Sequence, residues 1–279
     1  MKRPCGPRVR VLALLASAGL LWVATPSVAA GKSDLDQLEL VGSVRTVVTK
    51  HPQLKTTHQF DRDGRLTALE LVPAKEADAA RYAYQYDQQG RLIEEQAFTP
   101  DGKVEFRKHF RYGMDDQGRL SVQIAATEEG TLAHAAFYLY DSRGILHEEV
   151  MITGQGIAEK SLYDVRGGLV YHARYFQSRL VLEATHLYGP LGRLKESRFY
   201  AGDGMLMRKD LFRYDPNGNR VEQSSEFYRQ AHLKRSVVSY EFDHAGNWVK
   251  ETVQRWTEKN GSTVLTETVV SRERIVTYY

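Results

Sequence analysis

The chain has 279 residues, 42% of them apolar, and carries 38 lysines and arginines against 35 aspartates and glutamates. Four of the bases and none of the acids lie in the first thirty residues, which leaves 34 bases against 35 acids in the remainder. A nucleic-acid-binding domain would be net basic or carry a clustered basic face, so we expect no nucleic acid among the partners.

Residues 1–30 have the three parts of a secretory signal peptide. A basic start is followed by an apolar run from Val11 to Ala24 and by small residues up to Ala30 that suit cleavage. The apolar run is shorter than the roughly 20 residues that span a bilayer, and no second run follows. We therefore expect export, no transmembrane span in the mature chain, and a periplasmic or secreted location.

The cysteine content supports a fold held together by packing. The single cysteine, Cys5, lies in the basic start, so the mature chain has neither a disulfide nor a thiol nucleophile. A lipoprotein would carry a cysteine just after the apolar run, so lipid anchoring is not expected.

The mature chain opens with a short segment that precedes the first strands. Asp34 to Gln37 has the spacing of a capping box and predicts one short helical turn. The apolar and β-branched pattern of Leu38 to Lys50 and of Leu54 to Phe60 predicts two strands.

From residue 60 onward an aromatic-Asp-x-x-Gly-Arg-Leu motif recurs, which indicates a repeat protein. The eight copies are Phe60–Leu66, Tyr86–Leu92, Asp115–Leu120, Tyr140–Leu146, Tyr163–Leu169, Tyr188–Leu194, Tyr214–Val221 and Phe242–Val249. Their turn glycines lie 23 to 28 residues apart: Gly64, Gly90, Gly118, Gly144, Gly167, Gly192, Gly218 and Gly246.

A second, weaker set of turns divides the repeats. Gly102, Gly130, Gly156 and Gly204 each follow a motif glycine by 12 residues, so one repeat reads strand, turn, strand, turn. An aspartate that opens a four-residue turn and a glycine in the left-handed conformation fit a type I turn with a glycine bulge. The motif aspartates are therefore structural.

Aromatic and polar residues alternate between the turns, as in Arg81 to Tyr86, and this period of two predicts strands. Tight turns leave no room for crossover helices, so the strands should form an antiparallel meander. Val72 to Ala80 is a loop or one helical turn, and Thr263 to Tyr279 supplies the last arm. Open sheets rarely exceed about 10 strands without curling or splitting. We expect one all-β domain over residues 31–279, with about eight two-stranded repeats in a strongly twisted, coiled or partly closed sheet.

The motif copies resemble the YD repeats of the RHS repeat family, over roughly Phe60 to Val249. The resemblance implies hairpins of the kind that build spiralling β shells in large exported bacterial proteins, and older naming links such repeats to carbohydrate binding. The chain is most similar to a small stand-alone exported RHS-like protein. The resemblance implies no shared activity and brings no catalytic residue.

Residue patterns for catalysis and metal binding are not found in the sequence. The nine histidines form no short metal-ligand spacing, and no Gly-x-Ser-x-Gly elbow occurs. We expect no metal, no cofactor and no enzymatic activity.

One basic row is a candidate binding site. These arginines follow their turns and would line one edge if the hairpins stack in register: Arg65, Arg91, Arg119, Arg193 and Arg220. One interpretation is a ladder of surface pairs with the turn aspartates, each worth about 0–1 kcal/mol. The other is a site for an anionic glycan or an acidic protein surface.

The sequence thus predicts a non-enzymatic periplasmic binding or interaction protein whose partner is a protein or a cell-envelope glycan. The alternatives are a glycan-binding protein of the cell envelope and an immunity protein or chaperone for an exported toxin. A hydrolase would require His, Ser and acidic residues from different repeats to gather in a pocket. An outer-membrane barrel is disfavoured because Leu206 to Arg213 places charges on both strand faces.

Overall fold

The computed structural model describes residues 34–38, 40–74, 79–216, 218, 220–228, 234–259 and 262–279. The expected signal peptide of residues 1–30 lies outside these residues, as do residues 75–78 of the expected loop after the third strand. Over the described part of the chain, no helix has the length and apolarity needed to cross a membrane.

One short helix and eighteen strands make up the described chain. They are α2 (Asp34–Gln37), β1 (Val44–His51), β2 (Leu54–Phe60), β3 (Leu66–Pro73), β4 (Ala80–Tyr86), β5 (Leu92–Phe98), β6 (Val104–Met114), β7 (Leu120–Thr127), β8 (Leu132–Tyr140), β9 (Leu146–Thr153), β10 (Gly156–Tyr163), β11 (Leu169–Phe176), β12 (Arg179–Tyr188), β13 (Leu194–Ala201), β14 (Leu206–Tyr214), β15 (Arg220–Phe227), β16 (Lys234–Phe242), β17 (Trp248–Lys259) and β18 (Ser262–Tyr278).

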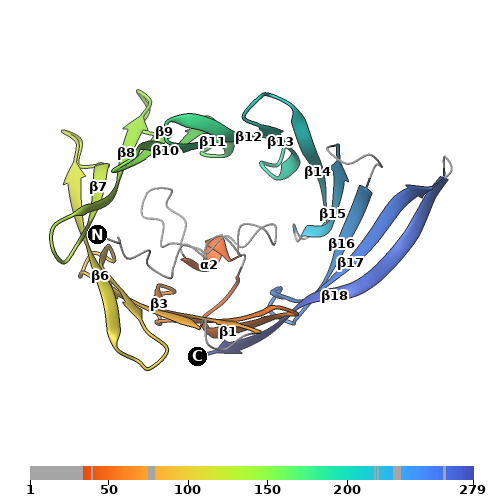
Figure 1. Cartoon of the computed structure of the whole chain (residues 1–279), viewed down its shortest axis with the longest axis horizontal. Coiled ribbons are helices and arrows are strands. Elements are labelled where there is room, and N and C mark those ends of the chain that lie inside the picture. The colour runs from red at the N-terminus through yellow and green to blue at the C-terminus, as the bar shows by residue number, and fades with distance from the viewer. Residues whose placement is uncertain are drawn as a thin grey trace, which may run out of the picture.

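The sheet is a closed barrel. Each strand pairs antiparallel with the next, and β18 pairs with β1, with Val47 opposite Val276 (Figure 1). The expected strongly twisted, coiled or partly closed sheet is therefore wrong, because the sheet closes fully. Twist and curvature accumulate over eighteen strands until the first and last strands meet, and their pairing joins the two ends of the sheet.

The motif turns have the predicted geometry. In the first copy the Gly64 N–H donates to the Asp61 carbonyl (3.1 Å) and the Asp61 N–H to the Arg65 carbonyl (2.9 Å). The Asp61 carboxylate also accepts from the N–H groups of Asp63 and Arg65, both at 2.9 Å. All eight motif glycines have φ between 71° and 97°, which confirms the predicted left-handed turn positions.

The apolar core lies inside one part of the barrel. The short helix α2, predicted from the capping box, is seen within the ring in Figure 1. Its Leu35 packs against a cluster on the inner face that includes Val47, Leu66 and Leu69, each 1% exposed. The Asp34 carboxylate accepts from the Leu66 N–H at 2.7 Å, which ties α2 to β3.

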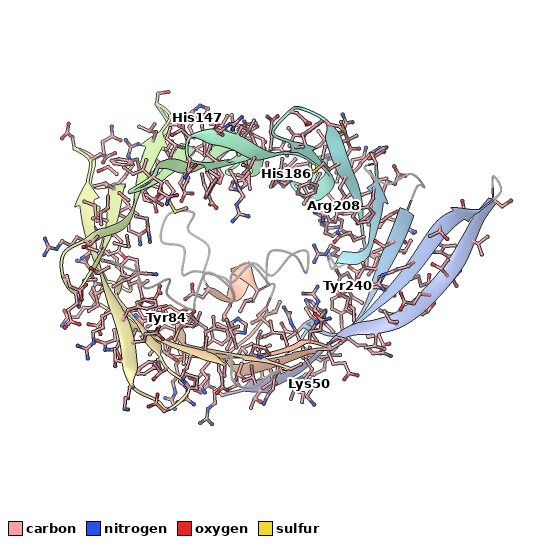
Figure 2. All side chains as sticks on the ribbon, in the orientation of Figure 1. Lys50, Tyr84, His147, His186, Arg208 and Tyr240 are labelled. Carbon is pink, nitrogen blue, oxygen red and sulfur yellow. The ribbon has the colours of Figure 1, made fainter. Side chains whose placement is uncertain are left out.

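Alternation along the strands separates an inner face from an outer face. Figure 2 shows Tyr84, His186 and Tyr240 on the inner side and Lys50 and His147 on the outer side. A barrel of about 16–18 strands is wider than the side chains of its wall can fill. The inner face therefore combines an apolar core beside α2 with a wall that has other chemistry.

Candidate binding surfaces

Four of the five predicted arginines form a row at the rim that carries the motif turns. Arg65, Arg91, Arg119 and Arg193 each stand directly after a motif glycine. Arg220 stands two residues after Gly218, at the position that leucine occupies in six other copies and Trp248 in the last. Its guanidinium carbon lies 5.3 Å from the centre of the Tyr240 ring, on the inner wall. The structure thus separates Arg220 from the row.

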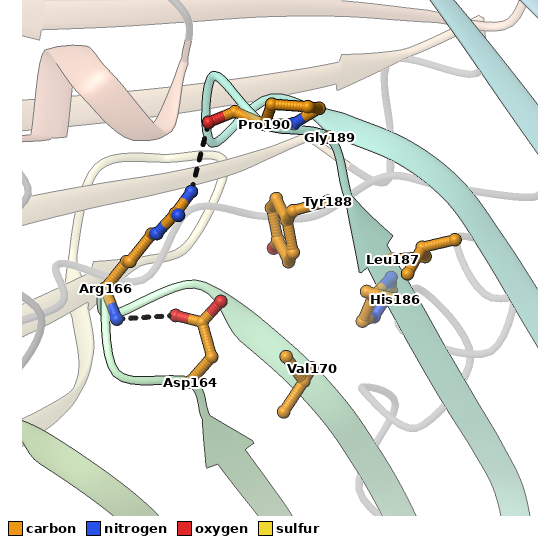
Figure 3. A pocket seen from close by; sticks show the side chains of 8 residues that line it. All are labelled: Asp164, Arg166, Val170, His186, Leu187, Tyr188, Gly189 and Pro190. Atoms are coloured by element: carbon orange, nitrogen blue, oxygen red, sulfur yellow. Dashed lines mark hydrogen bonds between the residues drawn. The ribbon is translucent and has the colours of Figure 1, made fainter.

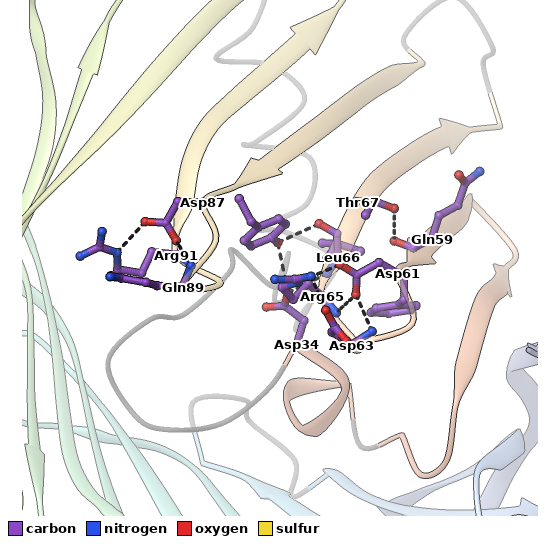
Figure 4. Close-up of polar contacts among 12 residues, drawn as sticks. Asp34, Gln59, Asp61, Asp63, Arg65, Leu66, Thr67, Asp87, Gln89 and Arg91 are labelled. Atoms are coloured by element: carbon purple, nitrogen blue, oxygen red, sulfur yellow. Dashed lines mark hydrogen bonds and ion pairs between the residues drawn. The ribbon is translucent and has the colours of Figure 1, made fainter.

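Arg65, Arg91 and Arg119 each contact an aspartate and a tyrosine, and Arg193 contacts the ring of Tyr214 and the carbonyl of Asp215. Within their own turns, Arg65, Arg91 and Arg119 pair through Nε with the motif aspartate at 2.7, 2.7 and 2.6 Å. Figure 4 shows the pairs of Arg65 and Arg91. Each guanidinium also lies over a tyrosine of the next repeat, as Arg119 does over Tyr140 at 4.5 Å. This is the motif tyrosine except for Arg91, whose partner Tyr112 stands three residues before Asp115. The corresponding distances are 5.7 Å for Arg65 and Tyr86, 5.3 Å for Arg91 and Tyr112, and 5.8 Å for Arg193 and Tyr214.

The motif tyrosine completes this link between repeats through its hydroxyl. Tyr140 donates to the carbonyl of Leu120 at 2.8 Å, and Tyr86 donates to the carbonyl of Leu66 at 2.8 Å. We call this set of contacts, from aspartate to arginine to the next tyrosine to leucine, the YD link. The guanidinium groups of the row are engaged in these contacts. The anion-binding interpretation of the row is tested by none of them and stays a prediction.

A belt of polar side chains crosses the inner wall from β9 to β15. In the strand register, each member of the belt but one lies directly opposite the next member on the neighbouring strand. The exception is His172, which lies opposite Ala184, two residues before His186. We define this polar belt as Glu149, Ser161, His172, His186, Ser197, Asp210 and Ser225. Glu149 and His186 are half-buried and the other five are buried.

Hydrogen bonds join the belt across the strands. Ser161 Oγ lies 3.1 Å from His172 Nδ1, and Ser197 Oγ lies 2.8 Å from His186 Nδ1. The Tyr163 hydroxyl donates to Glu149 at 2.8 Å. Buried polar groups are stable when they are hydrogen-bonded, so these contacts hold the belt in place within the wall.

Burial sets the protonation preference of the belt. It raises the pKa of the Asp210 and Glu149 carboxyls, although the positive charge of Arg208 and a hydrogen bond from Tyr163 act in the opposite direction. Burial lowers the pKa of the His172 and His186 imidazoles. In each case burial disfavours the charged form of the group. The ion pair of Asp210 with Arg208, 3.2 Å from Nε to Oδ1, opposes this effect.

Two serine–histidine contacts from different repeats raise the question of a hydrolase. A serine nucleophile must reach its substrate, whereas Ser197 is 2% and Ser161 9% exposed. Hydrogen bonding accounts for the contacts of these buried serines with the buried His172 and the half-buried His186. In the part of the chain that the structure describes, no three His, Cys, Asp or Glu side chains form a metal-binding group.

A pocket of about 410 Å³ adjoins the belt at the rim of the motif turns (Figure 3). His186, Tyr188 and Val170 line it together with the turns at Asp164 and Pro190. Arg166 bridges these turns, since its Nη1 donates to the Pro190 carbonyl at 3.2 Å. The pocket thus connects the polar belt to the rim.

The sequence did not reveal the polar belt. Its members are spaced 11 to 15 residues apart, one on each of seven successive strands, and carry no local motif. Only the strand register brings them to one level of the wall. A signal exists in the polar residues that replace apolar ones at inward positions of β10 to β15, but it can be read only once the inner face is known.

No family model and no curated protein matches the chain. Among solved structures, that of TcdB2-TccC3-Cdc42 aligns over 80% of this chain with 13% identity and a TM-score of 0.26, and this chain spans 16% of that one. A porin-like protein from Bacteroides uniformis ATCC 8492 aligns over 84% of this chain and 96% of its own, with 9% identity and a TM-score of 0.35. One from Bacteroides vulgatus ATCC 8482 aligns over 85% and 99%, with 10% identity and a TM-score of 0.33. Likenesses at this level assign neither a family nor an activity.

Proposed function

We propose that the protein is a non-enzymatic binding protein of the bacterial cell envelope, exported to the periplasm and built from RHS-like YD repeats. The observation that carries the proposal is the polar belt. An inner wall that served stability alone would be apolar, whereas β9 to β15 present buried serines, imidazoles and carboxyls at one level. Buried polar groups that converge on one concave surface are typical of ligand sites.

The hydroxyl, imidazole and carboxyl groups of the belt can exchange hydrogen bonds with a polar ligand, and this supports a cell-envelope glycan as the more specific candidate. The pKa directions at Asp210, Glu149, His172 and His186 all disfavour charge. Neutral donors and acceptors match sugar hydroxyls, and the pocket beside His186 adds the ring of Tyr188. This proposal rests on the belt and not on the arginine row.

The test compares two histidines on opposite faces of the barrel. His186→Leu alters the belt, and His147→Leu makes the same change on the exposed outer face (Figure 2). Tagged wild type and both variants, each from Gly31 to Tyr279, capture envelope proteins and peptidoglycan fragments, which mass spectrometry identifies against an empty tag. We expect capture to be lost only with His186→Leu.

A urea titration of both variants separates loss of binding from loss of folding. Equal capture by His186→Leu and wild type would contradict the belt as the site. Enrichment of one protein rather than glycan fragments would retain a binding protein but reject the glycan.

A further inference from the structure

One stretch of the closed barrel has an open edge. β18 runs from Ser262 to Tyr278, but β1 covers only its last part, up to the pair of Lys50 with Glu273. From Ser262 to Ser271, β18 pairs with β17 and with no other strand among the described residues. Figure 1 shows β17 and β18 extending beyond the ring, with β18 outermost.

This stretch of β18 stays uncovered because β1 ends before reaching it. This strand ends at His51, and the next residue, Pro52, has no N–H to continue the ladder before β2 starts at Leu54. About ten residues of β18, roughly 34 Å at the rise of an extended strand, therefore present unpaired backbone groups on one side.

The side chains of this edge suit another strand. Val264, Leu265 and Val270 are 43%, 42% and 44% exposed. The only charged residue from Ser262 to Ser271 is Glu267, and it forms an ion pair with Arg255 of the same hairpin. Natural edges are usually protected by lysine or proline, and this stretch has neither.

Two bulges interrupt the pairing with β17, but the ladder is regular between Glu267 and Val270. A β-strand edge of this kind pairs antiparallel with a copy of itself about a twofold axis. With Thr268 on the axis, Glu267 lies opposite Val269, so no two carboxylates face each other.

The geometry points to a homodimer in which the β18 edges of two copies pair antiparallel about Thr268, from Leu265 to Ser271. Three observations select a second copy of this chain as the occupant. The edge continues the existing β1–β18 ladder, its β-branched threonines and valines are good cross-strand partners for one another, and its single acid is already neutralised. Because each copy contributes only about seven paired residues, the dimer should dissociate reversibly on dilution.

Cysteine cross-linking tests the register. The only natural cysteine, Cys5, precedes Gly31, so the chain from Gly31 to Tyr279 has no competing thiol. Thr268→Cys places one thiol of each copy at the twofold axis and should give a disulfide-linked dimer under mild oxidation. Ile275→Cys alters a position that is 54% exposed but lies where β1 covers the edge, so this variant should not cross-link.

Sedimentation analysis of the unmodified chain gives a second readout that needs no variant. We expect the weight-average mass to fall from dimer toward monomer over a roughly hundredfold dilution, and Thr268→Lys, which sets two ammonium groups on the axis, to be monomeric throughout. A wild-type monomer at every concentration would overturn the proposal, as would equal cross-linking by Thr268→Cys and Ile275→Cys.

Discussion

At the scale of single residues, the motif turns require a conformation that few residues tolerate. Gly118 has φ of +75°, and a Cβ built there would meet no atom within 4 Å. Gly118→Val therefore adds backbone strain without a steric clash, and we expect it to cost about 1–3 kcal/mol. Gly154 is equally open and its φ is not in the left-handed region, so Gly154→Val is the matched control. Equal urea midpoints for the two variants would contradict the role of the turn.

A second residue-scale prediction concerns acid stability. His58 is 8% exposed, and burial, together with the positive charge of Arg274, lowers its pKa to about 4. In the unfolded chain the imidazole titrates near its ordinary value of about 6.5. Between these values the unfolded chain binds a proton that the folded chain does not, so stability falls as pH falls, by up to about 1.4 kcal/mol per pH unit.

His58→Phe removes this titration. Urea unfolding at about pH 7 and about pH 5 should show a smaller loss of stability for His58→Phe than for wild type. Near neutral pH, the difference in unfolding free energy between His58→Phe and wild type measures the packing change alone, so it serves as the internal control. If both proteins lost the same unfolding free energy between the two pH values, His58 would not contribute to the acid sensitivity.

At the scale of the elements, the YD link joins successive repeats at Arg65, Arg91 and Arg119. Tyr140 places its ring under Arg119 and its hydroxyl on the Leu120 carbonyl. Tyr140→Phe keeps the ring and removes only the hydrogen bond, so we expect a loss of about 1 kcal/mol in a urea titration. Tyr228→Phe removes an exposed hydroxyl bonded to Glu226 and should have almost no effect. A neutral Tyr140→Phe would indicate that water replaces the bond.

The same link explains why the arginines were visible in the sequence and their contacts were not. The pairs of Arg65 with Asp61 and of Arg91 with Asp87 are local, so the motif predicts them. The tyrosine under each arginine belongs to the next repeat and is brought there by register. Arg220 stands one position further from its turn glycine than the other four arginines. A shift of one residue along a strand moves a side chain to the other face of the sheet.

At the scale of the whole molecule, closure should make the repeats interdependent. An open array loses roughly one neighbour interface when a terminal element is removed. Here, deletion of Glu273–Tyr279 removes the strand opposite β1 and exposes Val44 and Val47, each 1% exposed in the closed barrel. We expect this truncation to abolish cooperative unfolding in urea.

Ile275→Thr, a change on the outer surface of the same strand, controls for local effects and should leave one cooperative transition. A truncated chain that kept most of its unfolding free energy would show that the sheet does not depend on closure.

The sequence alone determined the hairpins, because a turn such as Asp61 to Gly64 is specified by its own residues through backbone hydrogen bonds and a left-handed glycine. Period two likewise determined the strands. Only the tertiary structure decided that the sheet closes, because curvature is a sum over eighteen strands and no single repeat encodes where β1 will lie relative to β18. It also decided the polar belt and the open edge of β18, since both depend on which residues from distant strands share a level of the wall.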